Sequence, residues 1–95
     1  MDWQQKVKAC KAIGDIEIKM RDIGDWYINH SGVDRREGNF LCSGVVTNAK
    51  TPEEAINQHW EWLLDPVYYI VVNNYKGRHA FRWNGFMWEE VEEDK

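Results

Sequence analysis

Residues 51–66 read TPEEAINQHWEWLLDP, and this stretch carries the clearest helix pattern in the chain. Thr51 is placed to cap the first turn, and Pro52 suits the first helical position because its missing N–H would have no partner there. Glu54 can complete a capping box, and the final Asp-Pro pair ends the pattern. The sequence therefore predicts an amphipathic helix over residues 52–64. Its apolar stripe consists of Ile56, Trp60, Leu63 and Leu64.

The C-terminal third is typical of a three-stranded antiparallel meander. Asn84-Gly85 favours a two-residue hairpin turn, since both central residues of a type I′ turn need positive φ. Lys76-Gly77 can close a second such loop. These loops pair Trp83 with Phe86 on one side and with Ile70 on the other. We expect the preceding helix to cover one face of this sheet, made of Ile70, Val72, Phe81, Trp83, Phe86 and Trp88.

The opposite face of the meander is more apolar than most solvated sheet faces. It is open to two interpretations, a docking surface or an ordinary solvated face. With the acidic C-terminal run, it supplies the surface on which we expect a partner to dock. That run can equally be a solubilising end. The candidate partner-binding residues are Tyr69, Val71, Tyr75, Arg78, Arg82, Met87, Glu89, Glu90, Glu92 and Glu93.

The N-terminal half supplies the remaining elements of a predicted α+β fold. A short helix over residues 2–13, capped by Asp2, is followed by strands and a polar connection. The strands are expected at 16–20, 25–29 and 39–46, and the connection at 31–38. Long apolar sheet edges are costly, so we expect these strands to join the meander in one continuous sheet with both helices on one face.

Length and composition fit a single domain over residues 1–95 with an acidic tail at 89–95. The 95 residues are 43% hydrophobic and 29% charged, and the net charge is −4. That charge lies in the last seven residues, where five acidic side chains outweigh Lys95, so direct nucleic-acid binding is not expected. No apolar run is long enough to span a membrane, and the N-terminus lacks the layout of a signal peptide. We expect a cytoplasmic protein.

The sequence shows no pattern of catalytic or metal-binding residues. It contains no glycine-rich phosphate loop, paired-histidine metal helix or nucleophile elbow. His30, His59 and His79 are too scattered to predict a ligand set, and His59 reads as a residue at the boundary of the core. A dyad of Cys42 and His79 is conceivable, and a small hydrolase is the weakest alternative. We expect no catalytic residues, no cofactor and no bound metal.

Three segments resemble small proteins of tailed bacteriophages. They are GDWYI at residues 24–28, TPEEAI at 51–56 leading to His59-Trp60, and RWNGFMW at 82–88. Some phage proteins of similar size and acidity are inhibitors of host defence, such as anti-CRISPR proteins. The resemblance implies a non-catalytic protein that occupies a nuclease or a surveillance complex in the host cytoplasm.

These observations together predict a non-catalytic protein-binding module, a monomer or a homodimer, that blocks a functional surface of a host or phage protein. One alternative is a small-ligand module that sequesters a nucleotide signal with Tyr69, Tyr75, Arg78 and Arg82. Another is a structural or accessory protein of a phage.

Overall fold

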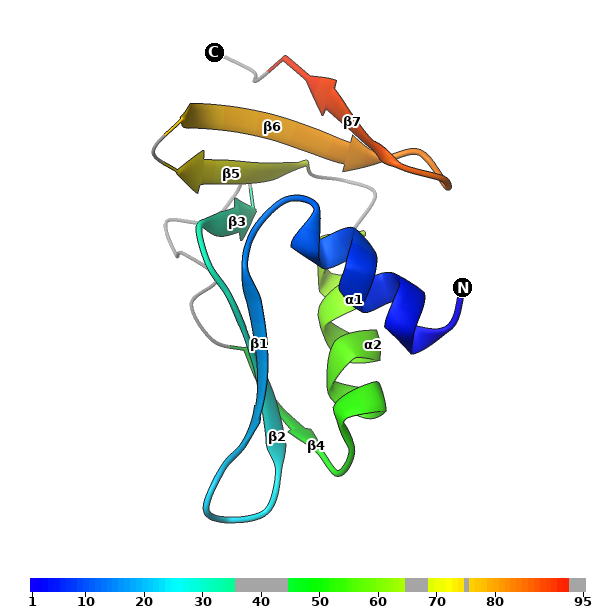
Figure 1. Cartoon of the computed structure of the whole chain (residues 1–95), viewed down its shortest axis with the longest axis vertical. Helices are drawn as coiled ribbons and strands as arrows, with labels where there is room; N and C mark the ends of the chain where they lie inside the picture. The colour runs from blue at the N-terminus through cyan, green and yellow to red at the C-terminus, as the bar shows by residue number, and fades with distance from the viewer. Residues whose placement is uncertain (36–44, 65–68, 75, 93–95) are drawn as a thin grey trace.

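The computed structural model describes residues 1–35, 45–64, 69–74 and 76–92. Within them, two helices lie beside a three-stranded sheet, and a four-stranded sheet crosses one end of that arrangement (Figure 1). The elements in chain order are α1 (Trp3–Lys11), β1 (Ile16–Met20), β2 (Trp26–His30), β3 (Val33–Arg35), β4 (Val45–Ala49), α2 (Pro52–Leu63), β5 (Ile70–Asn74), β6 (Gly77–Trp83) and β7 (Trp88–Val91). The α+β fold class predicted from the sequence is confirmed.

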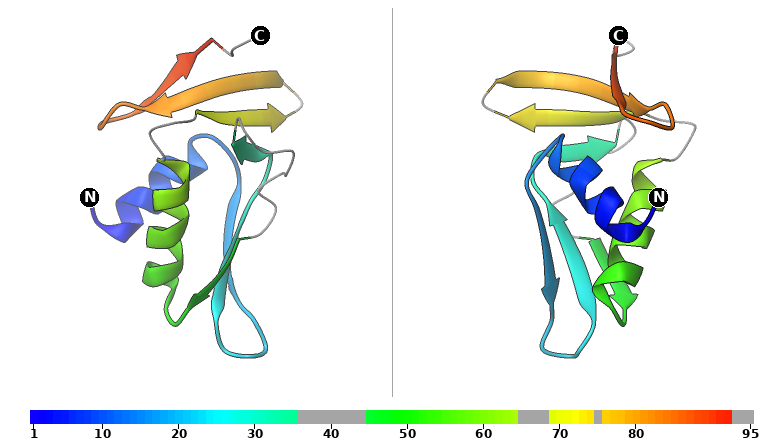
Figure 2. Two further views of the ribbon diagram at one scale, coloured as in Figure 1. Left: turned by 180° about the vertical axis from the view of Figure 1, so that it is seen from behind. Right: turned by 45° about the vertical axis from the view of Figure 1, so that its right-hand side comes forward.

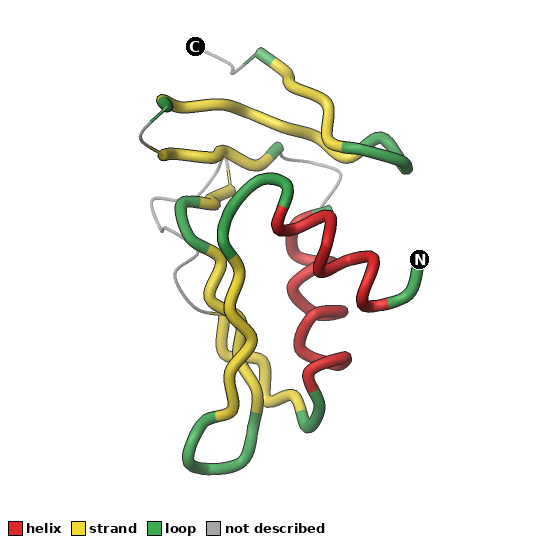
Figure 3. The backbone as a smooth tube through the Cα atoms, in the orientation of Figure 1, coloured by secondary structure: helices red, strands yellow, loops and turns green. Residues whose placement is uncertain are grey.

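The strands divide between two sheets, so the prediction of one continuous sheet is wrong. The first sheet has the order β1-β2-β4 and the second the order β3-β5-β6-β7, with antiparallel neighbours throughout. The tube in Figure 3 shows the chain leaving the first sheet after β2 and entering the second at β3. β3 falls within a segment that the sequence analysis assigned to a polar connection, because three residues are too few to show an alternating pattern.

Gly32 makes this crossing between the sheets possible. Its φ is +75°, and a Cβ atom at this position would lie 2.5 Å from the carbonyl oxygen of Asn73 on β5. The same close approach lets the Asn73 amide donate a hydrogen bond of 2.8 Å to the Gly32 carbonyl. A side chain would be strained by the dihedral angle and would also clash with backbone.

Both helices begin where the sequence predicts. The Asp2 carboxylate accepts the Gln5 amide at 2.8 Å, and the Gln5 side chain accepts the Asp2 amide at 2.9 Å, which completes a capping box. In α2 the Thr51 hydroxyl accepts the Glu54 amide at 3.1 Å. Glu54 reaches back to the amide of Lys50 at 3.1 Å, one residue before the cap, so the reciprocal bond expected to Thr51 is replaced by a similar one.

Two further predictions, the strand over residues 39–46 and the residues that end the second helix, fall partly outside the described residues. The strand expected over residues 39–46 is described only from Val45, and β4 then continues to Ala49. The Asp-Pro stop at positions 65 and 66 lies outside the described residues. The last residue of α2 is Leu63, with Leu64 as its C-cap.

The C-terminal meander is confirmed, but both of its hairpins are shifted by two residues from the predicted register. Ile70 lies opposite Phe81, and Trp83 lies opposite Trp88. The turn between β6 and β7 is longer than predicted because the Asn84 side chain closes it, accepting the amides of Phe86 at 2.8 Å and of Met87 at 3.0 Å. A shift of two preserves which face each strand residue occupies, so only the residues drawn into the turn change their surroundings.

The main core lies between the stripe of α2 and both sheets. Ile56, Trp60 and Leu63 are buried, and α2 packs along the strands of the first sheet. Trp60 also meets the second sheet, where its ring stands edge-on to Trp83 at a centroid distance of 5.0 Å and to Trp88 at 5.9 Å. The views in Figure 2 show how the second sheet lies across the end of the two helices. The expectation that α2 covers chiefly the meander is therefore corrected, since the first sheet takes most of the helix.

Five of the six residues predicted for the core face of the meander pack into this core, and Phe86 does not. Ile70 and Val72 are buried, and Phe81, Trp83 and Trp88 pack against the buried cluster. Phe86 lies in the turn and is 90% exposed. The longer turn that Asn84 closes is the physical reason for this error.

The reverse face of the meander is also different from the prediction. Tyr69, Val71 and Ala80 are buried there in a second, smaller cluster, and Val91 packs against it. This part of the face is therefore covered within the chain rather than open for docking.

The two aromatic residues Phe86 and Trp60 should respond very differently to truncation. We expect Phe86→Ala to change the free energy of unfolding by less than about 0.5 kcal/mol, because its ring lies in solvent. Trp60→Ala should cost about 3–5 kcal/mol, because it opens a cavity where the helix meets both sheets. Urea unfolding followed by circular dichroism measures both, and equal losses would contradict this description of the core.

Candidate functional site

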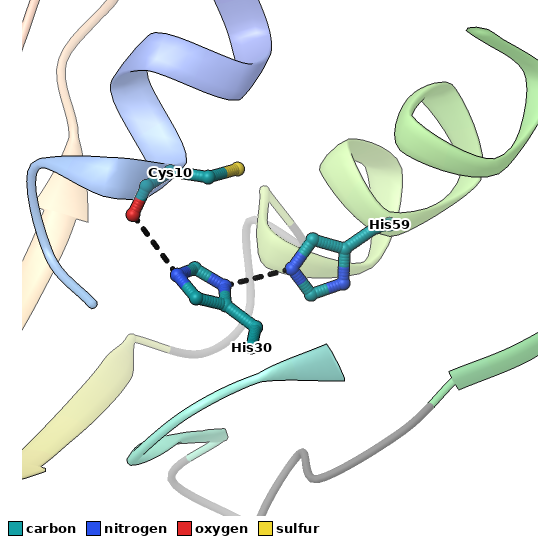
Figure 4. Close-up of side chains that lie close together, drawn as sticks. All are labelled: Cys10, His30 and His59. Atoms are coloured by element: carbon teal, nitrogen blue, oxygen red, sulfur yellow. Dashed lines mark hydrogen bonds between the residues drawn. The ribbon is translucent and has the colours of Figure 1, made fainter. Parts of the chain in front are cut away.

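A cluster of three side chains with nitrogen and sulfur donors lies in the core where α1, β2 and α2 meet. Cys10, His30 and His59 are each fully buried, and one donor atom from each lies within 4.8 Å of the others. Figure 4 shows the two imidazole rings side by side, with Cys10 above them at the end of α1. Among the described residues this is the group with the spacing of a metal-ligand set.

The local sequence turns each of these side chains inward. Cys10 follows Val7 by three residues on the inner stripe of α1, and His59 follows Ile56 by three residues on the stripe of α2. His30 lies two residues after the buried Ile28 on β2, on the same face of the strand. The three residues are thus core positions by periodicity, although two of them are polar.

The hydrogen bonds of the cluster fix the tautomers of both histidines. The Cys10 carbonyl can only accept, so the Nε2–H of His30 donates to it at 2.9 Å. The Nδ1 of a neutral His30 then carries a lone pair, and the Nε2–H of His59 donates to it at 2.9 Å. In this arrangement the Nδ1 of His59 also carries a lone pair. That atom is buried without a hydrogen-bond partner among the described residues.

Burial keeps both rings neutral. It lowers the pKa of His30, and the hydrogen bond to the Cys10 carbonyl opposes that effect only in part. Burial, with a smaller contribution from repulsion by His30, lowers the pKa of His59 to about 3. Both imidazoles therefore keep a lone pair available at neutral pH, which is the form that binds metal ions.

Sequence reasoning missed this cluster because its members are far apart along the chain. The expectation that His59 lies at the boundary of the core is wrong, since its ring is fully buried and stacks on Trp62 at a centroid distance of 5.8 Å. A usable signal was present, namely a histidine on an apolar helix stripe and another in phase with a buried strand residue. His79 lies elsewhere, with its Nδ1 3.4 Å from a Glu90 oxygen. The proposed dyad cannot be placed because Cys42 lies outside the described residues.

A second candidate site is an apolar groove of about 560 Å³ between α1 and the hairpin of β6 and β7. The turn of that hairpin lies above α1 in Figure 1. Residues from two parts of the chain line the groove: Met1, Gln5, Lys8, Ala9, Ala12 and Ile13 at the N-terminal end, and Phe81, Trp83, Phe86, Met87 and Trp88 from the hairpin. The indole N–H of Trp88 donates to the Ala9 carbonyl at 3.0 Å and so fixes one wall against the other. Phe86, at 90% exposed, and Met87, at 60%, stand at the rim.

The predicted partner-binding residues are only partly brought together. Tyr69 and Val71 are buried, while Tyr75 and Glu93 lie outside the described residues. Met87 lines the groove. The rest are exposed and lie on β6 and on β7, the edge strand of the second sheet, or just beyond it: Arg78, Arg82, Glu89, Glu90 and Glu92.

No family model, curated protein or solved structure matches this chain. Neither of the two described helices is long and apolar enough to cross a membrane. The site must therefore be interpreted from its own geometry and chemistry.

The buried histidines should make the fold sensitive to mild acid. Their pKa values are lowered in the folded state, so the unfolded chain binds more protons below about pH 6.5, and stability present above that pH is lost as the pH falls. Below about pH 6.5, each ring that stays neutral in the folded state should lower the free energy of unfolding by about 1.4 kcal/mol per pH unit. Urea unfolding at about pH 7, 6 and 5 tests this expectation.

Between about pH 5 and 6.5 the histidines of the unfolded chain take up protons while the carboxylates do not, so a loss of stability in this range reports on the histidines. The hydrogen bond from Arg21 holds the pKa of Asp25 below its usual value, so this carboxyl titrates at lower pH. His79→Asn should retain the acid sensitivity, because His79 lies outside the cluster. Equal stability at about pH 7 and 5 would contradict the description of two buried neutral rings.

Proposed function

We propose that this chain is a non-catalytic protein-binding module that docks its partner in the groove between α1 and the β6–β7 hairpin. The observation that carries the proposal is the exposure of Phe86 and Met87 on the rim of a groove whose lining is mostly apolar. Large apolar side chains that stand in solvent beside a concave apolar surface mark interaction sites. The proposal keeps Met87 from the predicted docking surface and moves the surface away from Tyr69 and Val71, which are buried.

The lining favours a protein segment over a small polar ligand. A small-molecule site combines apolar walls with several convergent polar groups that fix orientation. Here the polar side chains of the lining are Gln5 and Lys8, both on α1. The buried position of Tyr69 also removes one of the stacking residues on which the nucleotide alternative depended.

The charge beside the groove defines the chemistry of the partner. β7 follows the hairpin turn directly, and its Glu89 and Glu90 are exposed, as is Glu92 just beyond it. Lys8 in the lining and Arg82 opposite Glu89 offset two of these three carboxylates, so the excess charge beside the groove is negative and steers partners with complementary charge. We infer that the partner offers bulky apolar side chains flanked by lysine or arginine.

The identity of the partner stays a prediction. The resemblance to small proteins of tailed bacteriophages implies a nuclease or a surveillance complex of host defence, occupied at a functional surface. A basic partner surface is consistent with that implication, because nucleic-acid-handling proteins carry clustered cations. The oligomeric state likewise stays a prediction.

Selection from a random peptide library on the immobilised protein tests the docking site even while the natural partner is unidentified. We expect the selected peptides to carry two or three bulky apolar residues next to Lys or Arg. They should bind the double variant Phe86→Ser/Met87→Ser at least about tenfold more weakly than the original chain, which is about 1.4 kcal/mol.

The chain offers a closely matched control for this experiment. Ile23 is 78% exposed and Met20 is 60% exposed, and both lie at the β1–β2 end of the molecule, away from the groove. The variant Met20→Ser/Ile23→Ser removes a similar amount of exposed apolar surface and should bind the peptides as the original chain does. Selection of acidic peptides, or equal losses in the two double variants, would refute the proposed site.

A further inference from the structure

The cluster of Cys10, His30 and His59 has nearly the geometry of a three-ligand metal site. With the zinc–nitrogen and zinc–sulfur lengths of about 2.0 and 2.3 Å as the scale for a late first-row ion, three evenly spread ligands lie about 3.5–3.7 Å apart. The nitrogens of His30 and His59 are 2.9 Å apart, and all three donor atoms lie within 4.8 Å. Shifts of about 1 Å or less, within the range of side-chain adjustment, would seat an ion among them.

His30 is already oriented as a metal ligand. A ligating histidine usually donates its second ring N–H to a carbonyl or a carboxylate, which fixes the tautomer and turns the other nitrogen to the metal. The Nε2–H of His30 donates to the Cys10 carbonyl, and its Nδ1 faces the Nε2 of His59. An ion inserted between these nitrogens would replace the N–H···N bond, with the His59 proton moving to its other ring nitrogen.

The histidine pair is a costly way to fill the core without a ligand. Both rings are removed from water, and the Nδ1 of His59 has no hydrogen-bond partner among the described residues, which costs about 1–3 kcal/mol. This atom stays unpartnered when an ion binds at the other ring nitrogen, so the metal–nitrogen bonds offset the cost without removing it. Apolar side chains of similar volume at positions 30 and 59 would avoid this cost. Two imidazoles facing each other beside a thiol are therefore better explained by a ligand than by packing.

The charge of the buried cluster selects the ion. A thiolate with a monovalent ion and two neutral imidazoles has no net charge, whereas a divalent ion would leave one positive charge buried. No carboxylate among the described residues belongs to the group, so that charge would be uncompensated and costly. Thiolate ligands also favour copper(I) among the metal ions available to proteins. We propose that Cys10, His30 and His59 bind one copper(I) ion per chain.

Binding would add a metal bridge between three elements that packing and hydrogen bonds already bring together. The thiol proton of Cys10 leaves to solvent as the copper–sulfur bond forms, and α1, β2 and α2 are then joined through one ion. A ligand that binds only the folded state stabilises it by mass action. The copper-loaded protein should accordingly unfold at a higher temperature than the same protein without copper.

Anaerobic titration of the reduced protein with copper(I), in competition with a chromogenic chelator, measures this site. We expect one ion per chain and an unfolding midpoint raised by at least about 5 °C at a hundredfold excess over Kd. Cys10→Ser and His59→Asn should each weaken binding at least about tenfold. His79→Asn should bind as the original chain does, because His79 does not belong to the cluster.

X-ray absorption at the copper edge keeps the test decisive even if a variant at the buried cluster fails to fold. The loaded protein should show one sulfur and two imidazole ligands around the ion. The proposal is overturned by a copper shell without imidazole, by loss of binding in the His79→Asn control, or by zinc raising the unfolding midpoint where copper(I) does not. A failure here leaves the groove proposal untouched, because that proposal rests on the exposed rim residues Phe86 and Met87.

Discussion

The apolar stripe of α2 is the constraint on which the rest of the structure depends. Ile56, Trp60 and Leu63 lie on one side of a twelve-residue helix and must all be removed from water. Each large side chain contributes about 1.5–3 kcal/mol when buried. One three-stranded sheet does not cover the whole stripe, and Trp60 therefore packs against Trp83 and Trp88 of the second sheet. The two sheets are held in relation to each other because both cover the same helix.

The sequence was informative wherever a local pattern carries its own physical cause. Thr51 and Pro52 mark the start of α2 because capping depends only on residues within one turn. The alternation in the meander correctly assigned Ile70 and Trp83 to the inner face, because side-chain direction survives a shift of two residues. It failed at Phe86, where the choice between a two-residue turn and a longer one depends on the hydrogen bonds that Asn84 makes.

The division into two sheets and the buried cluster could not be derived in this way. Both depend on contacts between distant residues, such as the 29 positions that separate His30 from His59. A periodic pattern shows that a residue faces inward but does not show what it will meet there. The clearest warning was the polar character of His30 and His59 at inward positions, since buried polar groups are rare unless a partner or a function requires them.

The C-terminal end of α1 connects the two candidate sites. A carbonyl oxygen in the last turn of a helix can accept a second hydrogen bond, and here two adjacent ones accept side-chain donors from different sheets in addition to backbone amides. The Cys10 carbonyl accepts from His30 of the first sheet, and the Ala9 carbonyl accepts from Trp88 of the second. Donors at this end of a helix are also favoured by its dipole. The inner face of α1 thus supplies Cys10 to the buried cluster while its outer face supplies Ala9 and Ala12 to the groove, and the same two bonds hold both sites in place.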